Sequence, residues 1–216
     1  MHTKRLAAPS SVRIPRKEKK WVVSHSPGPY RKERSVPMLV VLRDLIGCCD
    51  RAKEGKFILA KRLVKVDGRV VTDLGFPVGL MNSLSVGEDH YRVTLDNKGF
   101  KFVKSADPET KLVRIEDIRN VKGGKFQIST HDGRNILMDA KGYSTGTTLR
   151  IKVPDQEIME HYELKEDALA LVTRGKHMGK MAQIKGLRAP LGLTPAVVVF
   201  DEFEVPMDCV FVVGGD

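Results

Sequence analysis

The sequence predicts a mostly β chain of the α+β class, in which a short helical region follows a basic N-terminal segment. Apolar residues recur at helical spacing only between about residues 37 and 60. After residue 64, short alternating or continuous apolar segments are separated by clusters of Gly, Asp and Asn, which is typical of strands joined by turns. Residues 1–35 show neither pattern and carry ten Lys or Arg but only two Glu.

These first 35 residues, called the arm below, hold most of the formal net charge of +10. Four prolines interrupt the arm, and it has few large apolar residues, so we expect it to stay unfolded until a polyanion neutralises it. The predicted partner is nucleic acid. Trp21 could stack on a base, or the Trp21-Val22-Val23 segment could dock the arm on a protein surface. The arm residues predicted to bind are Lys4, Arg5, Arg13, Arg16, Lys17, Lys19, Lys20, Trp21, Arg31, Lys32 and Arg34.

Residues 36–88 are predicted to form a small α/β domain. A buried helix should begin near Pro37 and end at Gly47, and a second helix should run over residues 51–60 with Asp50 as its N-cap. The Asp67-Gly68 pair between apolar alternations is a strong hairpin signal. Helix and hairpin could present one cationic face, whose predicted contact residues are Arg43, Arg51, Lys53, Lys56, Lys61, Arg62, Lys65 and Arg69.

The rest of the chain reads as β structure. We expect a central antiparallel domain over residues 89–163, a small barrel or sandwich. A last β unit follows over residues 164–216. The strands predicted in the central domain span residues 91–95, 100–103, 112–115, 126–130, 135–138 and 148–153.

A glycine-containing loop follows the apolar segment that begins at residue 168. Glycines allow a tight loop with exposed amides, which can donate to phosphate while neighbouring cations hold its charge. The segment resembles the KOW motif of ribosomal and transcription-associated proteins, although Ala182 replaces the motif's later glycine, and the resemblance implies an SH3-like β-barrel for residues 164–216. A glycine-rich turn with surface lysines is the alternative. The predicted contact residues are Arg174, Gly175, Lys176, His177, Gly179 and Lys180.

The second helix and the hairpin resemble the S4-type RNA-binding fold. Further segments accompany them in order: HTKRLAAP at 2–9, PGPY at 27–30, VPMLVVLRD at 36–44, VDGRV at 66–70 and FPVGLM at 76–81. With the KOW-like segment, nearly the whole chain is similar to the S4e family of small-subunit ribosomal proteins, and its compact length looks archaeal. The resemblance implies a structural protein without catalysis or cofactor. It would bind and stabilise small-subunit ribosomal RNA beside neighbouring ribosomal proteins, supporting subunit assembly and translation.

Enzymatic, metal-binding and membrane functions lack support in the sequence. The histidines and the three cysteines show no zinc-ligand spacing, and we expect Cys48, Cys49 and Cys209 to act as buried small hydrophobes. The cluster over residues 130–134 reads as a turn rather than an acid/base site. No apolar stretch approaches the roughly 20 residues of a membrane span, so we expect a cytoplasmic protein with no membrane or small-molecule partner.

Two rival functions remain. S4-type domains also occur on pseudouridine synthases, but these require a catalytic aspartate in an Arg-Leu-Asp context, which is not found here. A transcription or translation factor could use a KOW module to bind a protein. The acidic segment 201–206 departs from the family pattern and weakens the case for RNA contact by the final strands.

Overall fold

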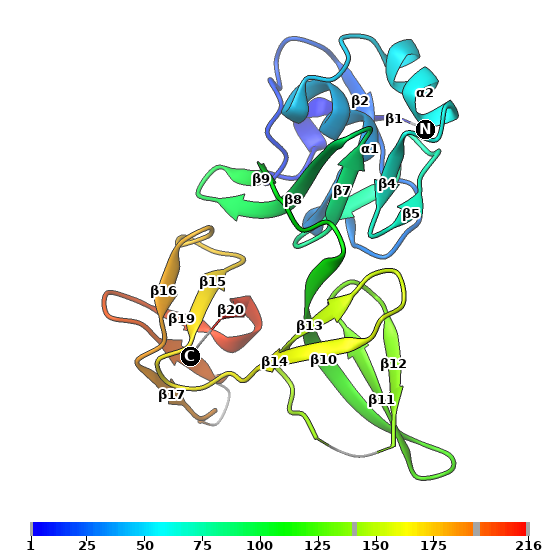
Figure 1. Cartoon of the computed structure of the whole chain (residues 1–216). Helices are drawn as coiled ribbons and strands as arrows, with labels where there is room; N and C mark the ends of the chain where they lie inside the picture. Colours follow the sequence, from blue (N-terminus) through cyan, green and yellow to red (C-terminus); the bar gives the residue numbers. More distant parts are fainter. Residues whose placement is uncertain (1, 140–141, 192–194, 215–216) are drawn as a thin grey trace. The chain divides into compact units, whose positions relative to one another are not determined.

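The computed structural model describes residues 2–139, 142–191 and 195–214 (Figure 1). It forms two units, Met1–Lys111 with Val153–Asp155, and Leu112–Lys152 with Gln156–Asp216. Most elements are strands and the helices are few, so the predicted mostly β class is confirmed. No helix of the described residues is long and apolar enough to cross a membrane.

The first unit carries both α-helices and a five-stranded antiparallel sheet with strand order β5-β4-β7-β8-β9. Two small antiparallel pairs, β1-β2 and β3-β6, complete it. Its elements are β1 (His2–Lys4), η1 (Arg5–Ala7), β2 (Trp21–Val23), η2 (Lys32–Arg34), β3 (Ser35–Pro37), α1 (Met38–Val40), η3 (Val41–Ile46), α2 (Ala52–Ala60), β4 (Val64–Val66), β5 (Arg69–Val70), β6 (Pro77–Gly79), β7 (Ser83–Val86), β8 (Asp89–Asp96) and β9 (Gly99–Lys104).

Both predicted helices are present. The first continues from α1 into the π-helical segment η3 and ends at Gly47, whose φ of 80° is left-handed. The second, α2, begins one residue later than expected, and its N-cap is Arg51 rather than the predicted Asp50. The Glu54 carboxylate accepts hydrogen bonds from the Asp50 and Arg51 N–H groups. Those two donors, Arg51 first, lower the pKa of Glu54. The negative charge of this carboxylate is also stabilised by the positive, N-terminal end of the helix dipole.

The arm is folded in this structure, so the prediction of an unfolded arm is wrong. Val12, Ile14 and Val22 are buried in the main apolar core of the first unit. The Phe100 N–H donates to the Ser11 carbonyl oxygen at 3.1 Å, which fixes the arm beside β9. The sequence analysis undervalued these apolar residues because they are scattered between prolines and cations and show no regular period.

The predicted domain boundary after residue 88 crosses the first sheet. Strands β7 and β8 form a tight antiparallel hairpin, and β9 pairs with β8, so both β8 and β9 belong to the first unit rather than to a central domain. The strands themselves lie where the alternation predicted them. Strand spacing alone, however, does not say which sheet a strand joins.

The second unit contains one five-stranded sheet, ordered β12-β11-β10-β13-β14, and two three-stranded sheets, β16-β15-β20 and β17-β18-β19. Residues such as Val172, Val198 and Val212 form the core of the C-terminal part. No closed barrel is seen in the described strands. The elements are β10 (Thr110–Val121), β11 (Lys125–Thr130), β12 (Asn135–Met138), β13 (Thr148–Lys152), β14 (Ile158–Tyr162), β15 (Leu169–Val172), β16 (Met181–Gln183), β17 (Gly186–Arg188), β18 (Val197–Val199), β19 (Glu204–Pro206), η4 (Met207–Cys209) and β20 (Val210–Gly214).

Candidate nucleic-acid interface

The cations of the arm fall into two groups. Seven predicted contact residues are exposed and could reach a ligand: Lys4, Lys17, Lys19, Lys20, Trp21, Arg31 and Lys32. The arginines are mostly engaged within the protein. The sequence could not separate the two groups, because its charge pattern does not show which cations find partners on folding.

Arg5 and Arg16 stabilise the folded arm through hydrogen bonds to its own backbone. Arg5 is only 3% exposed, and its guanidinium donates to the Pro15 carbonyl oxygen at 2.6 Å. Arg16 donates to the carbonyl oxygens of Ala8 and Pro9 at 2.7 and 2.8 Å. A guanidinium satisfied by backbone carbonyls has little capacity left for phosphate. Arg5 and Arg16 therefore have structural roles within the arm, and a nucleic-acid contact by either of them stays a prediction.

Three further predicted arginines are partly buried. Arg13 pairs with Asp96 at 3.1 Å, which joins the arm to the end of β8. Arg43 pairs with its neighbour Asp44 at 2.7 Å, and the hydrogen bond from Asp44 raises the pKa of Arg43. Arg34 is half-buried. These arginines are less available than the exposed lysines.

The sequence left two roles open for the segment around Trp21, stacking on a base and docking of the arm, and the structure is compatible with both. Its neighbour Val22 is buried and docks β2 on the core, whereas the Trp21 side chain is 51% exposed. The Lys20 Nζ lies 5.4 Å from the centroid of the Trp21 ring. The arm is thus docked by Val22, and the indole remains accessible for stacking.

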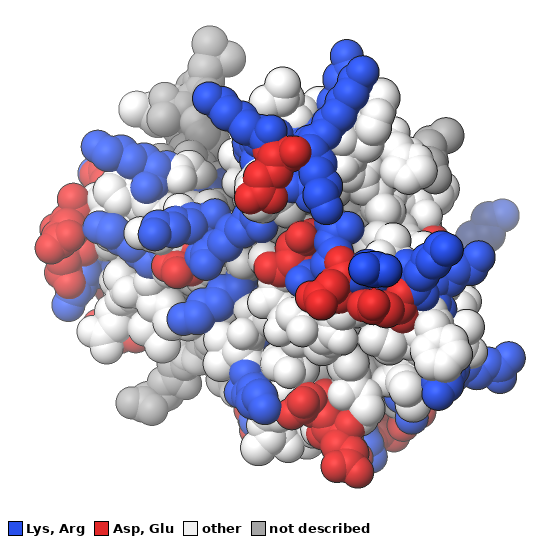
Figure 2. All heavy atoms as spheres, turned by 90° about the horizontal axis from the view of Figure 1, so that it is seen from above, with Lys and Arg blue, Asp and Glu red and all other residues white. Residues whose placement is uncertain are grey.

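The second helix and the hairpin carry a set of seven cations that we call the α2 patch: Arg51, Lys53, Lys56, Lys61, Arg62, Lys65 and Arg69. All seven are exposed, and none of them forms an ion pair with an acidic side chain of the described chain. Figure 2 looks down on the end where α2 lies, and basic side chains spread over most of this face with acidic ones between them. Unpaired cations on a helix and a hairpin suit a polyanion.

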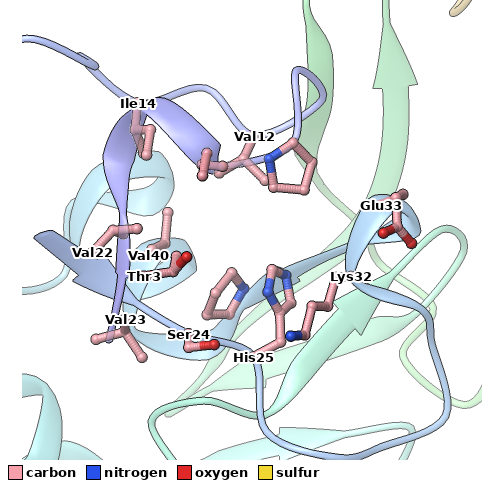
Figure 3. A pocket seen from close by; sticks show the side chains of 14 residues that line it. Thr3, Val12, Ile14, Val22, Val23, Ser24, His25, Lys32, Glu33 and Val40 are labelled. Carbon is pink, nitrogen blue, oxygen red and sulfur yellow. The ribbon is translucent and has the colours of Figure 1, made fainter. Parts of the chain in front are cut away.

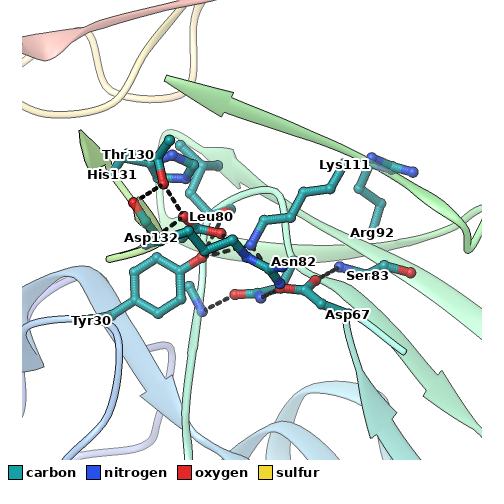
Figure 4. Close-up of polar contacts among 12 residues, drawn as sticks. Tyr30, Asp67, Leu80, Asn82, Ser83, Arg92, Lys111, Thr130, His131 and Asp132 are labelled. Atoms are coloured by element: carbon teal, nitrogen blue, oxygen red, sulfur yellow. Dashed lines mark hydrogen bonds and ion pairs between the residues drawn. The ribbon is translucent and has the colours of Figure 1, made fainter. Parts of the chain in front are cut away.

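A buried polar network holds the hairpin turn of the α2 patch (Figure 4). Asp67 and Gly68 both have positive φ, 49° and 77°, as a type I′ turn requires. The Asp67 carboxylate accepts from Lys111 Nζ at 2.8 Å, from Asn82 Nδ2 at 2.8 Å and from the Ser83 N–H at 3.0 Å. Lys111 also donates to the Tyr30 hydroxyl at 3.2 Å. The hairpin, the arm and β10 thus meet at one buried ion pair.

The glycine loop, residues 174–180, lies between β15 and β16. Gly175 and Gly179 adopt positive φ, 91° and 83°, and a Cβ on Gly175 would meet only open space. Hydrogen bonds within the described chain leave the N–H groups of Gly175, Lys176 and His177 without an acceptor. Arg174, Lys176 and Lys180 are exposed around them. Free amides beside cations form the arrangement predicted for phosphate.

The acidic segment contacts this loop. The His177 ring stacks on Phe203 with 4.3 Å between centroids and an interplanar angle of 10°. The Lys180 Nζ lies 5.2 Å from the centroid of the Phe203 ring and 3.9 Å from the Glu202 carboxylate. Ala182, at the place of the missing glycine, pairs with Ala170 as an ordinary strand residue. Phe203 therefore orients the loop, and Glu202 partly screens Lys180.

The residues considered for catalysis have structural surroundings. The Arg134 Nε donates to Asp132 at 2.9 Å, and the Thr130 hydroxyl donates to the other Asp132 oxygen, so these residues form the predicted turn (Figure 4). His131 packs edge-on against Phe211 and accepts the Arg114 N–H at Nδ1. In the described residues, no group of three or more His, Cys, Asp or Glu could hold a metal ion.

The cysteines only partly follow expectation. All three are free; Cys49 is buried and Cys209 is half-buried, as small hydrophobes can be. Cys48 is exposed, so its predicted burial is wrong. Gly47 has already ended the helix, and Cys48 no longer lies on its apolar face.

A small cavity of about 110 Å³ is lined mainly by residues of the arm, together with Pro37 and Val40 (Figure 3). Apolar residues such as Val12 and Val22 line it, and His25 and Lys32 lie side by side at its edge. The volume is well below the roughly 300–1,000 Å³ of small-molecule sites. Burial lowers the pKa of His25, although its hydrogen bond with the Ser35 carbonyl opposes this shift.

Comparisons with known proteins agree with this geometry. Residues 87–158 match the model of the ribosomal family S4e, and residues 1–33 match that of the RS4NT (NUC023) domain. The chain is 37% identical to small ribosomal subunit protein eS4 of Archaeoglobus fulgidus, covering 99% of this chain and 93% of the relative. It is 38% identical to that of Methanocaldococcus jannaschii, covering 100% and 94%. The crystal structure of the 30S ribosomal protein S4e from Thermoplasma acidophilum superposes with a TM-score of 0.77 and 31% identity, covering 86% of this chain and 97% of that one.

Proposed function

Because the chain belongs to the ribosomal protein S4e family, we propose that it is a structural constituent of the small ribosomal subunit that binds and stabilises the RNA of that subunit. The family is structural and non-enzymatic. The protein would reside in cytoplasmic ribosomes. Its partners would be small-subunit ribosomal RNA and neighbouring ribosomal proteins.

The α2 patch is the observation that carries the proposal. Seven exposed cations without acidic partners in the described chain occupy a helix and a hairpin that is fixed by a buried network. We assign this helix and hairpin to an S4-type RNA-binding fold. Since the helix and hairpin that carry these cations are folded before binding, less backbone entropy is lost when phosphates are contacted.

The arm and the glycine loop would add two further contacts. The exposed arm lysines would bind phosphates from a folded arm, and the glycine loop would offer three free amides and nearby cations to one phosphate. We assign the loop to a KOW-type module whose six strands would follow an SH3-like topology. Several modest contacts on one chain would join RNA segments that are distant in sequence, and so support assembly.

The salt dependence of binding to purified small-subunit ribosomal RNA tests the proposal. Neutralising Lys53→Gln and Lys56→Gln together should weaken binding, and should make the slope of log K against log salt shallower by about one to two, because each lost phosphate contact removes about 0.9. The matched control pair is Lys165→Gln and Lys185→Gln, which are exposed but lie outside the predicted contacts. Equal effects of the two pairs would contradict the α2 patch.

A further inference from the structure

We infer that Phe57 on α2 is a stacking site for an unpaired RNA base within the α2 patch, an inference that rests on the proposed function. A large aromatic side chain normally gains stability by burial. Phe57 nevertheless leaves 60% of its surface exposed, while its neighbour Leu59 is fully buried against the core. Its side chain is therefore free for a ligand.

The cations around Phe57 identify the chemistry of that ligand. Lys53 and Lys61 lie four residues before and four residues after Phe57, so these three side chains share one helix face, and Lys56 directly precedes Phe57 in the sequence. Lys61 Nζ lies 4.3 Å from the centroid of the Phe57 ring. A flat apolar ring beside exposed lysines matches a nucleotide, in which a base lies a few ångströms from a phosphate.

An unpaired base is favoured over a base in a duplex. Bases inside a helix are already stacked on each other, whereas a splayed base offers a free face to an aromatic side chain. A neighbouring protein could also cover Phe57, but the exposed cations of the α2 patch, with Lys61 directly over the ring, favour a polyanion. The phosphates would bind the lysines, and the base would lie on the ring.

The test compares Phe57→Ala with Phe57→Tyr, which keeps a stacking ring, and with the control Leu63→Ala, which removes an apolar side chain of similar exposure from the same unit. Affinity for small-subunit ribosomal RNA should fall about tenfold for Phe57→Ala and stay unchanged for the other two variants. The salt slope of Phe57→Ala should equal that of the parent, because no cation is lost. A short single-stranded RNA carrying 2-aminopurine should lose its binding-induced fluorescence quenching only with Phe57→Ala.

Two results would overturn the inference. One is an unchanged RNA affinity of Phe57→Ala when Lys53→Gln with Lys56→Gln does weaken binding. The other is an unchanged RNA affinity together with failure of this variant to recruit another ribosomal protein during subunit reconstitution, which would assign Phe57 to a protein contact. Failure of the lysine variant to weaken binding would instead count against the α2 patch itself, so the two hypotheses fail separately.

Discussion

At the scale of single residues, the charge of Lys111 is fully buried, because its side chain has no exposed surface and its Nζ lies 2.8 Å from Asp67. Replacing one member of a buried pair leaves the other charge unpaired. Lys111→Met should therefore lower the free energy of unfolding by about 3–5 kcal/mol, measured by urea denaturation. The sequence could not predict this burial, since a lysine in a strand usually lies on the solvent face.

The Lys104–Asp89 pair is the control, since its 2.9 Å contact matches that of Lys111 and Asp67 but its lysine is 74% exposed. Lys104→Met should change the unfolding free energy by less than about 1 kcal/mol. The double variant Lys111→Met with Asp67→Asn should recover part of the loss, because it removes both buried charges. Similar costs for Lys111→Met and Lys104→Met would show that the buried ion pair contributes little.

His25 should make the stability of the folded protein depend on pH. Burial lowers its pKa from the ordinary 6.5 in the folded protein. The unfolded chain therefore binds more protons near that pH, so the stability contributed by His25 is full above 6.5 and is lost as the pH falls. Stability of the parent relative to His25→Gln should decrease between about pH 7.5 and pH 5.5. A difference that stays constant over this range, measured by denaturant unfolding, would contradict the assignment.

At the scale of elements, the contact between the arm and β9 depends on Gly99. Its φ is 123°, and a Cβ there would lie 2.1 Å from the Ser11 carbonyl oxygen of the arm backbone. Backbone cannot move aside as a side-chain tip can, so Gly99→Ala should separate residues 1–35 from the sheet. Limited proteolysis should then cleave the arm of the variant much faster than that of the parent.

Gly123 provides the matched control for Gly99. It also has positive φ, 90°, in a hairpin turn, but a Cβ there meets nothing within 4 Å. Gly123→Ala should cost only the backbone strain of about 1–2 kcal/mol and leave arm proteolysis unchanged. Equal acceleration of arm cleavage in both variants would mean that general destabilisation, rather than contact with Ser11, exposes the arm.

The local elements were predictable because local chemistry determines them. Asp67-Gly68 requires positive φ at both residues, and Gly47 ends a helix, so the hairpin and the first helix lie where the sequence placed them. Which sheet β8 and β9 join depends on pairing between strands, which no local pattern records. The arm was misjudged for a similar reason, since its apolar residues gain stability only from partners far along the chain.

At the scale of the whole molecule, the charge pattern predicted the class of binding partner better than it predicted which residues are available for contact. The cations of the α2 patch are exposed as helix and hairpin periodicity required. Arg5 and Arg16 instead donate hydrogen bonds to carbonyl oxygens of the arm. Only the folded path of the backbone reveals these contacts. Phe57 was missed because its spacing on α2 does not distinguish an exposed ring from one facing the core.

If the α2 patch and the glycine loop bind one RNA at the same time, the effects of substitutions in the two sites should be additive. The α2 patch and the glycine loop belong to different units and share no residue. If both bind one RNA at the same time, the free-energy costs of Lys53→Gln with Lys56→Gln and of Arg174→Gln with Lys176→Gln should add within about 0.5 kcal/mol in the combined variant, and their salt-slope changes should add too.

Alternative binding modes would give a different pattern. If either site could hold the RNA without the other, each pair of substitutions alone would cost little, since the intact site would compensate. The combined variant would then lose far more than the sum of the two. Titrating the four proteins against the same ribosomal RNA at several salt concentrations distinguishes these cases, and only additivity agrees with one chain that joins two RNA segments at once.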